Sequence, residues 1–139
     1  MKKGYKQLLA EANAIVETLS VAEAHALAGA DNVQFVDIRD VRELRAEGKI
    51  PGAVHAPRGM LEFWVDPESP YYREVFAQNP ETPKRFVLFC AAGWRSALAA
   101  KTLMEMGMEN VCHMEGGFTA WKEAGYPLEL PPAAKKGHE

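Results

Sequence analysis

Residues 86–103, FVLFCAAGWRSALAAKTL, constrain the fold of this chain more than any other stretch. The apolar run 85–90 is typical of a strand covered on both faces, and it ends at Cys90. A strong helix pattern over 96–107 follows after a few small residues. In open parallel sheets built from such βα units, ligands bind beyond the carboxyl ends of the strands. The sequence therefore predicts a reactive site around Cys90.

The same alternation of strands and helices extends along the chain. Further strands are predicted at 32–40 and 110–114, and a brief strand follows a turn within 50–57; shorter helices are predicted at 20–29, 40–47 and 118–125. Capping-box patterns at Ser20 with Glu23, and at Asp40 with Glu43, mark the starts of two of these helices. We expect an α/β fold with an open, mostly parallel, five-stranded sheet, of which four strands are recognised here, flanked by helices on both faces.

Residues 20–128 are expected to form the main domain, since a chain of 139 residues suits one hydrophobic core. Residues 1–19 carry an apolar stripe at helical spacing and predict an N-terminal helix, packed on the domain or on a second copy of it. The aromatic insertion 58–85 is either a flap that walls the site or a small core that covers one sheet edge. The tail 129–139 is expected to be loose.

Composition excludes several classes of protein. The net charge is −3 and there is no basic stripe, so nucleic acid is not an expected partner. No run approaches the roughly 18 apolar residues of a membrane span, and Glu11, Asn13 and Glu17 interrupt any leader-like apolar run. We expect a cytoplasmic protein. Two cysteines do not make a disulfide framework.

The residues after Cys90 suit a nest of backbone amides. Small side chains let the loop close around the sulfur, and Gly93 can take a positive φ without strain. The helix that follows, expected from Ser96, adds partial positive charge at its start. Such a nest favours the nucleophilic thiolate of Cys90, and equally a persulfide on it. The alternative is a buried structural cysteine.

The length of this loop distinguishes two chemistries. Cysteine phosphatases place five residues between cysteine and arginine, whereas four separate Cys90 from Arg95. A smaller ring is better matched to one sulfur atom than to a phosphate. Sulfur transfer is therefore favoured, and phosphate ester hydrolysis is second, with Asp66 and Glu68 as its candidate general acids.

Taken in order, the motifs resemble a single-domain rhodanese, a sulfurtransferase. They are VDIRD (36–40), IPGAVHAP (50–57), FCAAGWRS (89–96) and GGFTAW with its trailing GYP (116–127). The resemblance implies that Cys90 is the nucleophile that accepts sulfur. It also implies a persulfide cradle formed by Ala91, Ala92, Gly93, Trp94, Arg95 and Ser96. No metal and no organic cofactor is implied.

The resemblance also implies a two-step covalent reaction with ping-pong kinetics. A donor such as thiosulfate would pass its terminal sulfur to Cys90 and release sulfite. A thiol, cyanide or protein acceptor would then remove the sulfur. Because Ala91 and Ala92 add no positive charge, Arg95, helped by Arg58, would have to attract the thiosulfate dianion. A persulfide is therefore an alternative donor.

A non-catalytic rhodanese-like module that binds a protein is a third hypothesis. The insertion 58–85 and the N-terminal helix exceed a minimal rhodanese domain, and they suggest a specific partner or a homodimer formed through that helix. An intact Cys90 argues against a purely binding role.

Each supporting residue has more than one interpretation. Asp37, with Arg39, either orients an arginine of the site or forms a structural ion pair. Arg95 binds the donor, braces the loop against Asp37 or Glu43, or does both. Trp94 is expected to form an apolar rim that keeps water from the persulfide, rather than to contact a partner.

The remaining cysteine and the strand histidines are expected to be structural. Cys112 should be a packed thiol, with a resolving role toward Cys90 as the alternative. His55 and His113 lack a second ligand at metal spacing, so packing or hydrogen bonding is expected, with a minor polar role open for His55. Gly116 and Gly117 should serve the turn into the last helix.

Overall fold

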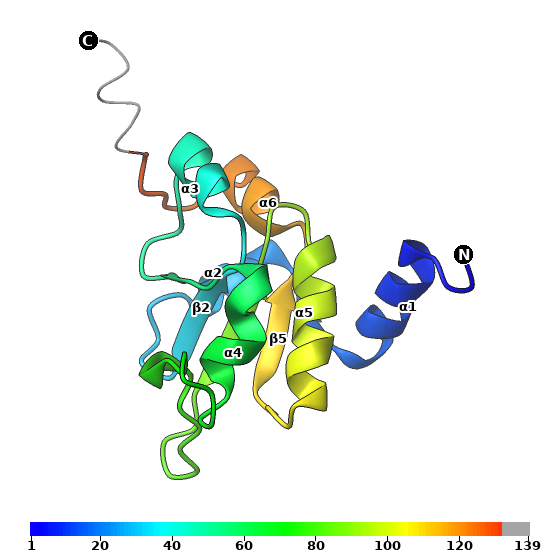
Figure 1. Ribbon diagram of the computed structural model, residues 1–139. Coiled ribbons are helices and arrows are strands. Elements are labelled where there is room, and N and C mark those ends of the chain that lie inside the picture. Colours follow the sequence, from blue (N-terminus) through cyan, green and yellow to red (C-terminus); the bar gives the residue numbers. More distant parts are fainter. Residues whose placement is uncertain (132–139) are drawn as a thin grey trace.

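A computed structural model describes residues 1–131 and shows one five-stranded sheet (Figure 1). Its strands are β1 (Glu17–Leu19), β2 (Val33–Asp37), β3 (Val54–His55), β4 (Arg85–Phe89) and β5 (Val111–Met114). They lie in the order β1-β5-β4-β2-β3, and each neighbouring pair is parallel. The predicted fold class is confirmed.

Helices cover both faces of the sheet. They are α1 (Tyr5–Ile15), α2 (Val21–Leu27), α3 (Val41–Glu47), α4 (Leu61–Val65), α5 (Trp94–Glu105) and α6 (Gly117–Glu123), with short 3-10 turns η1 (Arg58–Met60) and η2 (Glu74–Phe76). Helices α4 and α5 lie on one face, and α2 and α6 lie on the other (Figure 1). Both expected capping boxes are present, which confirms the predicted starts of α2 and α3.

Strand β4 shows why the apolar run at 85–90 is continuous. Phe86 and Leu88 point into the core under α4 and α5, whereas Val87 and Phe89 point into the core under α2 and α6. All four side chains are fully buried. Because successive side chains of a strand point to opposite faces, a strand covered on both faces must be apolar throughout.

The N-terminal segment differs from the expected helix over 1–19. Helix α1 ends at Ile15, Val16 is extended, and residues 17–19 form the edge strand β1, paired with β5. Only Leu19 of this three-residue strand is buried, so its pattern is too short to be recognised in the sequence. The fifth strand thus lies outside the boundary expected at residue 20.

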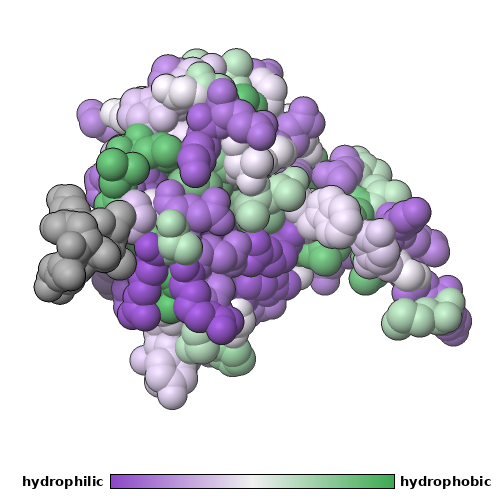
Figure 2. Space-filling model, turned by 90° about the horizontal axis from the view of Figure 1, so that it is seen from above, coloured by the Kyte–Doolittle hydropathy of each residue, from purple (hydrophilic) through white to green (hydrophobic). Residues whose placement is uncertain are grey.

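Helix α1 packs on this domain, against α5, with Ala12 buried. Three of its apolar side chains stay about half exposed, namely Tyr5, Leu8 and Ile15. In a view onto the edge where the strands end, α1 projects from the body as an arm (Figure 2).

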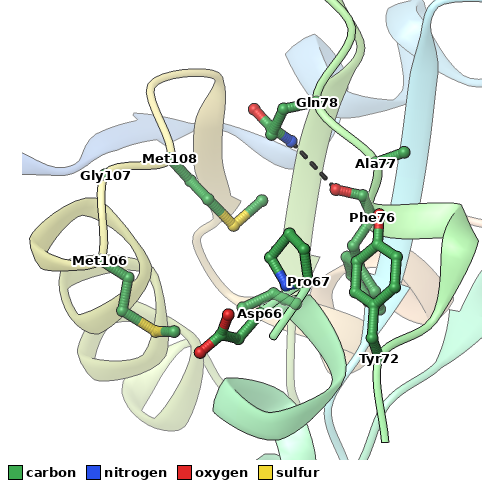
Figure 3. Close-up of a pocket in the computed structure, with 10 residues that line it drawn as sticks. Asp66, Pro67, Tyr72, Phe76, Ala77, Gln78, Met106, Gly107 and Met108 are labelled. Carbon is green, nitrogen blue, oxygen red and sulfur yellow. Dashed lines mark hydrogen bonds between the residues drawn. The ribbon is translucent and has the colours of Figure 1, made fainter. Parts of the chain in front are cut away.

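The insertion 58–85 covers the face of the sheet on the α5 side. Leu61, Val65 and Phe76 are buried there with Leu103 of α5. Its outer part borders a hollow of about 480 Å³ that Met106 and Met108 close from the end of α5 (Figure 3). Since α5 begins at the Cys90 loop and its 12 residues span about 18 Å, this hollow lies far from Cys90. The described contacts show a core over a face of the sheet and not over an edge, and a flap that walls the site stays a prediction.

The chain end expected to be loose is held at its start. The backbones of Lys49 and Glu129 exchange two hydrogen bonds, of 3.0 and 2.8 Å, and Pro131 is buried. The rest of that prediction, residues 132–139, lies outside the described residues. Within residues 1–131, no helix combines the length and the apolar character needed to cross a membrane.

Candidate functional site

Cys90 lies directly after β4, at the carboxyl edge of the sheet, as the sequence predicts. Its side chain is 1% exposed. The loop that encloses it runs from Ala91 to Gly93, and α5 begins at Trp94, two residues earlier than the expected start at Ser96. The sulfur is therefore at the base of a narrow ring.

Two backbone amides donate to the Cys90 sulfur. The N–H of Gly93 lies 3.1 Å from Sγ and that of Ser96 lies 3.4 Å from it, while the Ser96 hydroxyl oxygen is 3.6 Å away. Gly93 has φ +98°, which confirms the left-handed conformation predicted for it. This conformation turns the Gly93 N–H back toward the sulfur just before α5 starts. The ring is thus a nest of donors for a negatively charged sulfur.

Helix α6 holds the other side of the same loop. The amides of Phe118 and Thr119 donate to the carbonyls of Cys90 and Ala91, at 2.8 and 3.1 Å. Gly117, with φ +58°, allows this approach, because a Cβ there would collide with both carbonyl oxygens. The expected turn role of Gly117 is therefore incomplete: it also lets α6 contact the loop. The two glycines are visible in the GGF motif, but their contact with the Cys90 loop is recognised only in the folded structure.

Arg95 braces the loop against α3. Its guanidinium donates two hydrogen bonds to the carboxylate of Glu43, at 2.8 and 2.9 Å. These bonds lower the pKa of Glu43 and raise the pKa of Arg95, to which Cys90 adds a smaller contribution. Of the two acids considered for Arg95, Glu43 is thus the partner. The positive charge of Arg95 is therefore largely offset by the carboxylate of Glu43.

Arg58 is paired elsewhere. Its guanidinium binds the carboxylate of Glu62, one turn further along the chain, at 3.1 Å. Among the described residues, no hydrogen bond joins Arg58 to Cys90. Its predicted help in attracting a donor stays a prediction.

Asp37 and Arg39 form a buried ion pair. The Arg39 guanidinium donates to Asp37 at 2.8 to 3.2 Å, binds the carbonyl of Gly48 and lies 3.9 Å over the Phe118 ring. Both side chains are 1% exposed. Asp37 therefore pairs with its neighbour in the turn after β2 and not with Arg95. His55 bonds to the carbonyl oxygen of Arg39 at 2.7 Å, which ties β3 to the same turn.

The rim residues of the loop face the N-terminal helix. Trp94 is 58% exposed, and its ring packs on Tyr5 of α1 at 5.2 Å between centroids. It is therefore more open than the water-excluding rim that we expected. Ala92 borders a hollow of about 350 Å³ together with Trp94, Asn13 and His113.

His113 forms hydrogen bonds, as expected from the sequence, but its position beside the reactive cysteine was not predicted. It is 2% exposed, and its Nδ1 lies 3.0 Å from the hydroxyl oxygen of Ser96, next to the Cys90 sulfur. Its Nε2 lies 3.2 Å from both Thr18 and Asn13 of the N-terminal segment. The signal available in the sequence was strand alternation, which turns His113 to the α5 face and Cys112 to the opposite face.

Cys112 is the packed thiol that we expected. It is fully buried under α2 and α6, and its S–H points to the carbonyl of Phe86 at 3.6 Å. Burial raises the pKa of Cys112 to about 11. Both cysteines are free, and they lie in cores on opposite faces of the sheet. Among residues 1–131, no cluster of three or more His, Cys, Asp or Glu could hold a metal ion.

An open parallel sheet with a cysteine ring at its carboxyl edge is shared by a known protein family. Residues 20–124 match the rhodanese-like domain family, and the chain belongs to this family. The resemblance inferred from the motifs is thereby confirmed.

Relatives at modest identity include sulfurtransferases. The chain is 33% identical over 105 residues to a sulfurtransferase of Allochromatium vinosum, covering 76% of this chain and 86% of that protein. It is 28% identical over 100 residues to thiosulfate sulfurtransferase/rhodanese-like domain-containing protein 3 of Mus musculus. That match covers 71% of this chain and only 64% of the mouse protein.

Two solved structures are similar along most of the chain. One is a Rhodopseudomonas palustris protein of unknown function described as a possible tyrosine phosphatase, 53% identical with a TM-score of 0.86, covering 93% of this chain and 96% of that one. The other is the polysulfide-sulfur transferase homodimer of Wolinella succinogenes, 32% identical with a TM-score of 0.71, covering 92% and 88%.

Proposed function

We propose that this protein is a sulfurtransferase that carries a sulfane sulfur as a persulfide on Cys90. The observation that carries the proposal is the pair of amides, from Gly93 and Ser96, aimed at the Cys90 sulfur inside a ring of four intervening residues. Donors held in this way stabilise negative charge on sulfur without reorganising. The family membership and the sulfurtransferase relatives support the same reaction class.

The reaction balances without a cofactor. The Cys90 thiolate attacks the outer sulfur of the donor, the donor's S–S bond breaks, and its electron pair leaves with sulfite or with a thiolate. An acceptor thiol or cyanide then attacks the outer sulfur of the persulfide, and the electron pair returns to Cys90. The loop amides serve both anionic forms of the site.

A polysulfide or persulfide donor suits this site better than thiosulfate. Arg95 is the cation nearest the ring, and Glu43 already offsets its charge, so little net attraction for a dianion remains. The polysulfide activity of the Wolinella succinogenes relative supports this choice. Thiosulfate is then a usable but weak donor.

Phosphate ester hydrolysis is the competing candidate, because a similar structure is described as a possible phosphatase. The candidate acid Asp66 borders the hollow near Met106, at the far end of α5 from Cys90, where it cannot protonate a leaving group at the ring. Glu68 follows it in the same segment and bonds through its amide to Asp66. These placements favour sulfur transfer.

Mass spectrometry of the intact protein tests the proposal. After incubation with polysulfide, and separately with thiosulfate, the protein should gain the mass of one sulfur atom, and cyanide should remove it. Cys90→Ser should gain none, whereas the matched control Cys112→Ser should gain as much as the unchanged protein. Hydrolysis of an aryl phosphate without sulfur uptake would replace this proposal with the phosphatase.

The third hypothesis and the homodimer are tested separately. A chain that takes up no sulfur and hydrolyses no phosphate, but retains a protein in pull-downs, would be a binding module. The homodimer expected through α1 stays a prediction, and it draws support from the homodimeric relative and from the half-exposed Tyr5, Leu8 and Ile15. Sedimentation measures it directly.

A further inference from the structure

His113 is a buried titratable group that the reaction described above does not use. It lies on β5 with Leu88 of β4 as its neighbour in register, and it points to the α5 face of the sheet. Burial lowers the pKa of His113, which favours a neutral imidazole while Cys90 is a thiol. A neutral imidazole has one nitrogen that donates and one that accepts.

The contacts of His113 assign these two roles. The Asn13 side-chain oxygen, 3.2 Å from Nε2, can only accept. The Thr18 hydroxyl donates its proton to the carbonyl of Val16, so its oxygen is also free to accept from Nε2. The proton therefore resides on Nε2, and Nδ1 carries a lone pair.

A continuous chain of hydrogen bonds then leads from Cys90 to α1. The S–H of Cys90 donates to the Ser96 hydroxyl at 3.6 Å, and that hydroxyl donates to Nδ1 of His113 at 3.0 Å. His113 donates from Nε2 to Asn13. Cys90, Ser96 and His113 are all at most 2% exposed, so bulk water does not compete between Cys90 and Nδ1 of His113.

We propose that His113 accepts the proton of Cys90 through Ser96, and that Asn13 of α1 positions His113 for this transfer. The proposal deepens the proposed function, on which its role in sulfur transfer rests. It makes the N-terminal segment, which lies outside the family match at 20–124, part of the site.

The transfer moves two protons and reverses the direction of the two hydrogen bonds that join Cys90 to Ser96 and Ser96 to His113. The S–H bond of Cys90 breaks and its electron pair stays on sulfur. That proton goes to the Ser96 oxygen as the Ser96 hydroxyl proton moves to Nδ1. The product is a thiolate, facing the amides of Gly93 and Ser96, and an imidazolium whose Nε2–H still donates to Asn13.

The surroundings of His113 leave the thiolate as its main charge partner. The neighbours are neutral Asn13 on α1, Thr18 on β1 and Leu88 on β4, with Ser96 on α5. Arg95 follows the loop but is held by Glu43, and the carboxylate of Glu115 borders the same 350 Å³ hollow. A carboxylate there favours the imidazolium as well.

The ultraviolet absorbance of the Cys90 thiolate, titrated against pH with Cys90→Ser as the blank, tests the proposal without a reagent or sulfur transfer. His113→Asn keeps an acceptor for the Ser96 hydroxyl but cannot take up a proton near pH 7. Its absorbance midpoint should rise by about one pH unit, and so should that of Ser96→Ala. The double variant should shift no further, because both substitutions interrupt one path.

Asn13→Asp gives a shift of opposite sign. A carboxylate facing Nε2 favours the imidazolium, so the midpoint should fall. Asn13 is exposed on α1, so this variant answers the question even if His113→Asn fails to fold. The matched control is His25→Asn on α2, where His25 stacks on Tyr126.

A purely structural role for His113 predicts other results. A midpoint unchanged in His113→Asn, or no downward shift in Asn13→Asp, would overturn the relay. If the midpoints shift as expected while the unchanged protein gains no sulfur from polysulfide, the relay stands and the proposed function fails. The two conclusions are thus separated by independent measurements.

Discussion

At the scale of residues, the site depends on charges that are already paired. Arg95 is held by Glu43, Arg58 by Glu62, and Arg39 by Asp37. What remains for the sulfur of Cys90 is a set of neutral donors, the amides of Gly93 and Ser96. Neutral donors stabilise a singly charged persulfide without attracting a dianion from solution. Under the proposed function, we expect the partner of Arg95 to set the preference between sulfur donors.

Glu43→Gln should improve the use of thiosulfate. The substitution removes the counter-charge of Arg95, so the KM for thiosulfate should fall by about two- to fivefold, with a smaller change for polysulfide. Steady-state kinetics with both donors measures this effect.

Glu47→Gln, on the same helix, is the matched control, since Glu47 lies at the exposed end of α3. Equal changes for both donors in Glu43→Gln would mean that Arg95 acts only as a brace of the loop. Glu43→Gln also alters the capping hydrogen bond that the Asp40 amide donates to Glu43, which accounts for part of any loss of stability in this variant.

At the scale of elements, the reactive loop is fixed by the starts of two helices. Helix α5 supplies the amide of Ser96 to the sulfur, and α6 supplies the amides of Phe118 and Thr119 to the loop carbonyls. Each helix is preceded by a glycine in the left-handed region, Gly93 before α5 and Gly116 before α6. Amides of α5 therefore bind the sulfur of Cys90, and amides of α6 bind the loop carbonyls.

Gly117→Ala should damage the loop beyond the cost of backbone strain. A Cβ at this φ costs about 1–3 kcal/mol, and it would also push against the carbonyls of Cys90 and Ala91. Sulfur uptake should fall along with the unfolding free energy. Denaturant unfolding and mass spectrometry measure the two effects.

Gly125→Ala is the control, because Gly125 has φ +79° with open space around its Cβ position. It should lose stability but keep full sulfur uptake. If both variants took up sulfur equally well, contact between α6 and the loop would not be required for the reaction.

At the scale of the whole molecule, the sheet separates the two cysteines. Cys90 belongs to the core under α4 and α5, and Cys112 to the core under α2 and α6. A disulfide between them would require strands to turn over, so oxidation should not join them. The thiol of Cys112 contributes to stability instead, as a neutral buried group.

The stability of the protein should fall between about pH 9 and 11 in a way that depends on Cys112. Burial raises the pKa of Cys112 to about 11, above its ordinary value of 9.0, so the folded state retains a proton that the unfolded state has lost. Stability is fully present below pH 9 and is lost as pH rises, by on the order of 2 kcal/mol.

Unfolding free energies across this range, compared with those of Cys112→Ala, isolate the contribution of this thiol. The variant should be less stable at neutral pH and should show a flatter decline above pH 9. Parallel declines in the two proteins would assign the pH dependence to other groups.

The sequence by itself determined the βα alternation, the helix caps and the position of Cys90. These depend on local properties: apolar period, cap residues, and small residues next to a cysteine. The same local reasoning predicted that Gly93 would take a positive φ, and that Cys112 would be packed.

Only the tertiary structure decided which charges pair and what lies behind the reactive loop. Glu43, Gly117 and His113 meet the loop from three elements distant in sequence, and β1 is identified only through its pairing with β5. Pairings across a sheet depend on strand order and register, which a short polar segment does not encode in its own pattern. A strand of three residues and a histidine aimed at a serine therefore become recognisable only after the chain has folded.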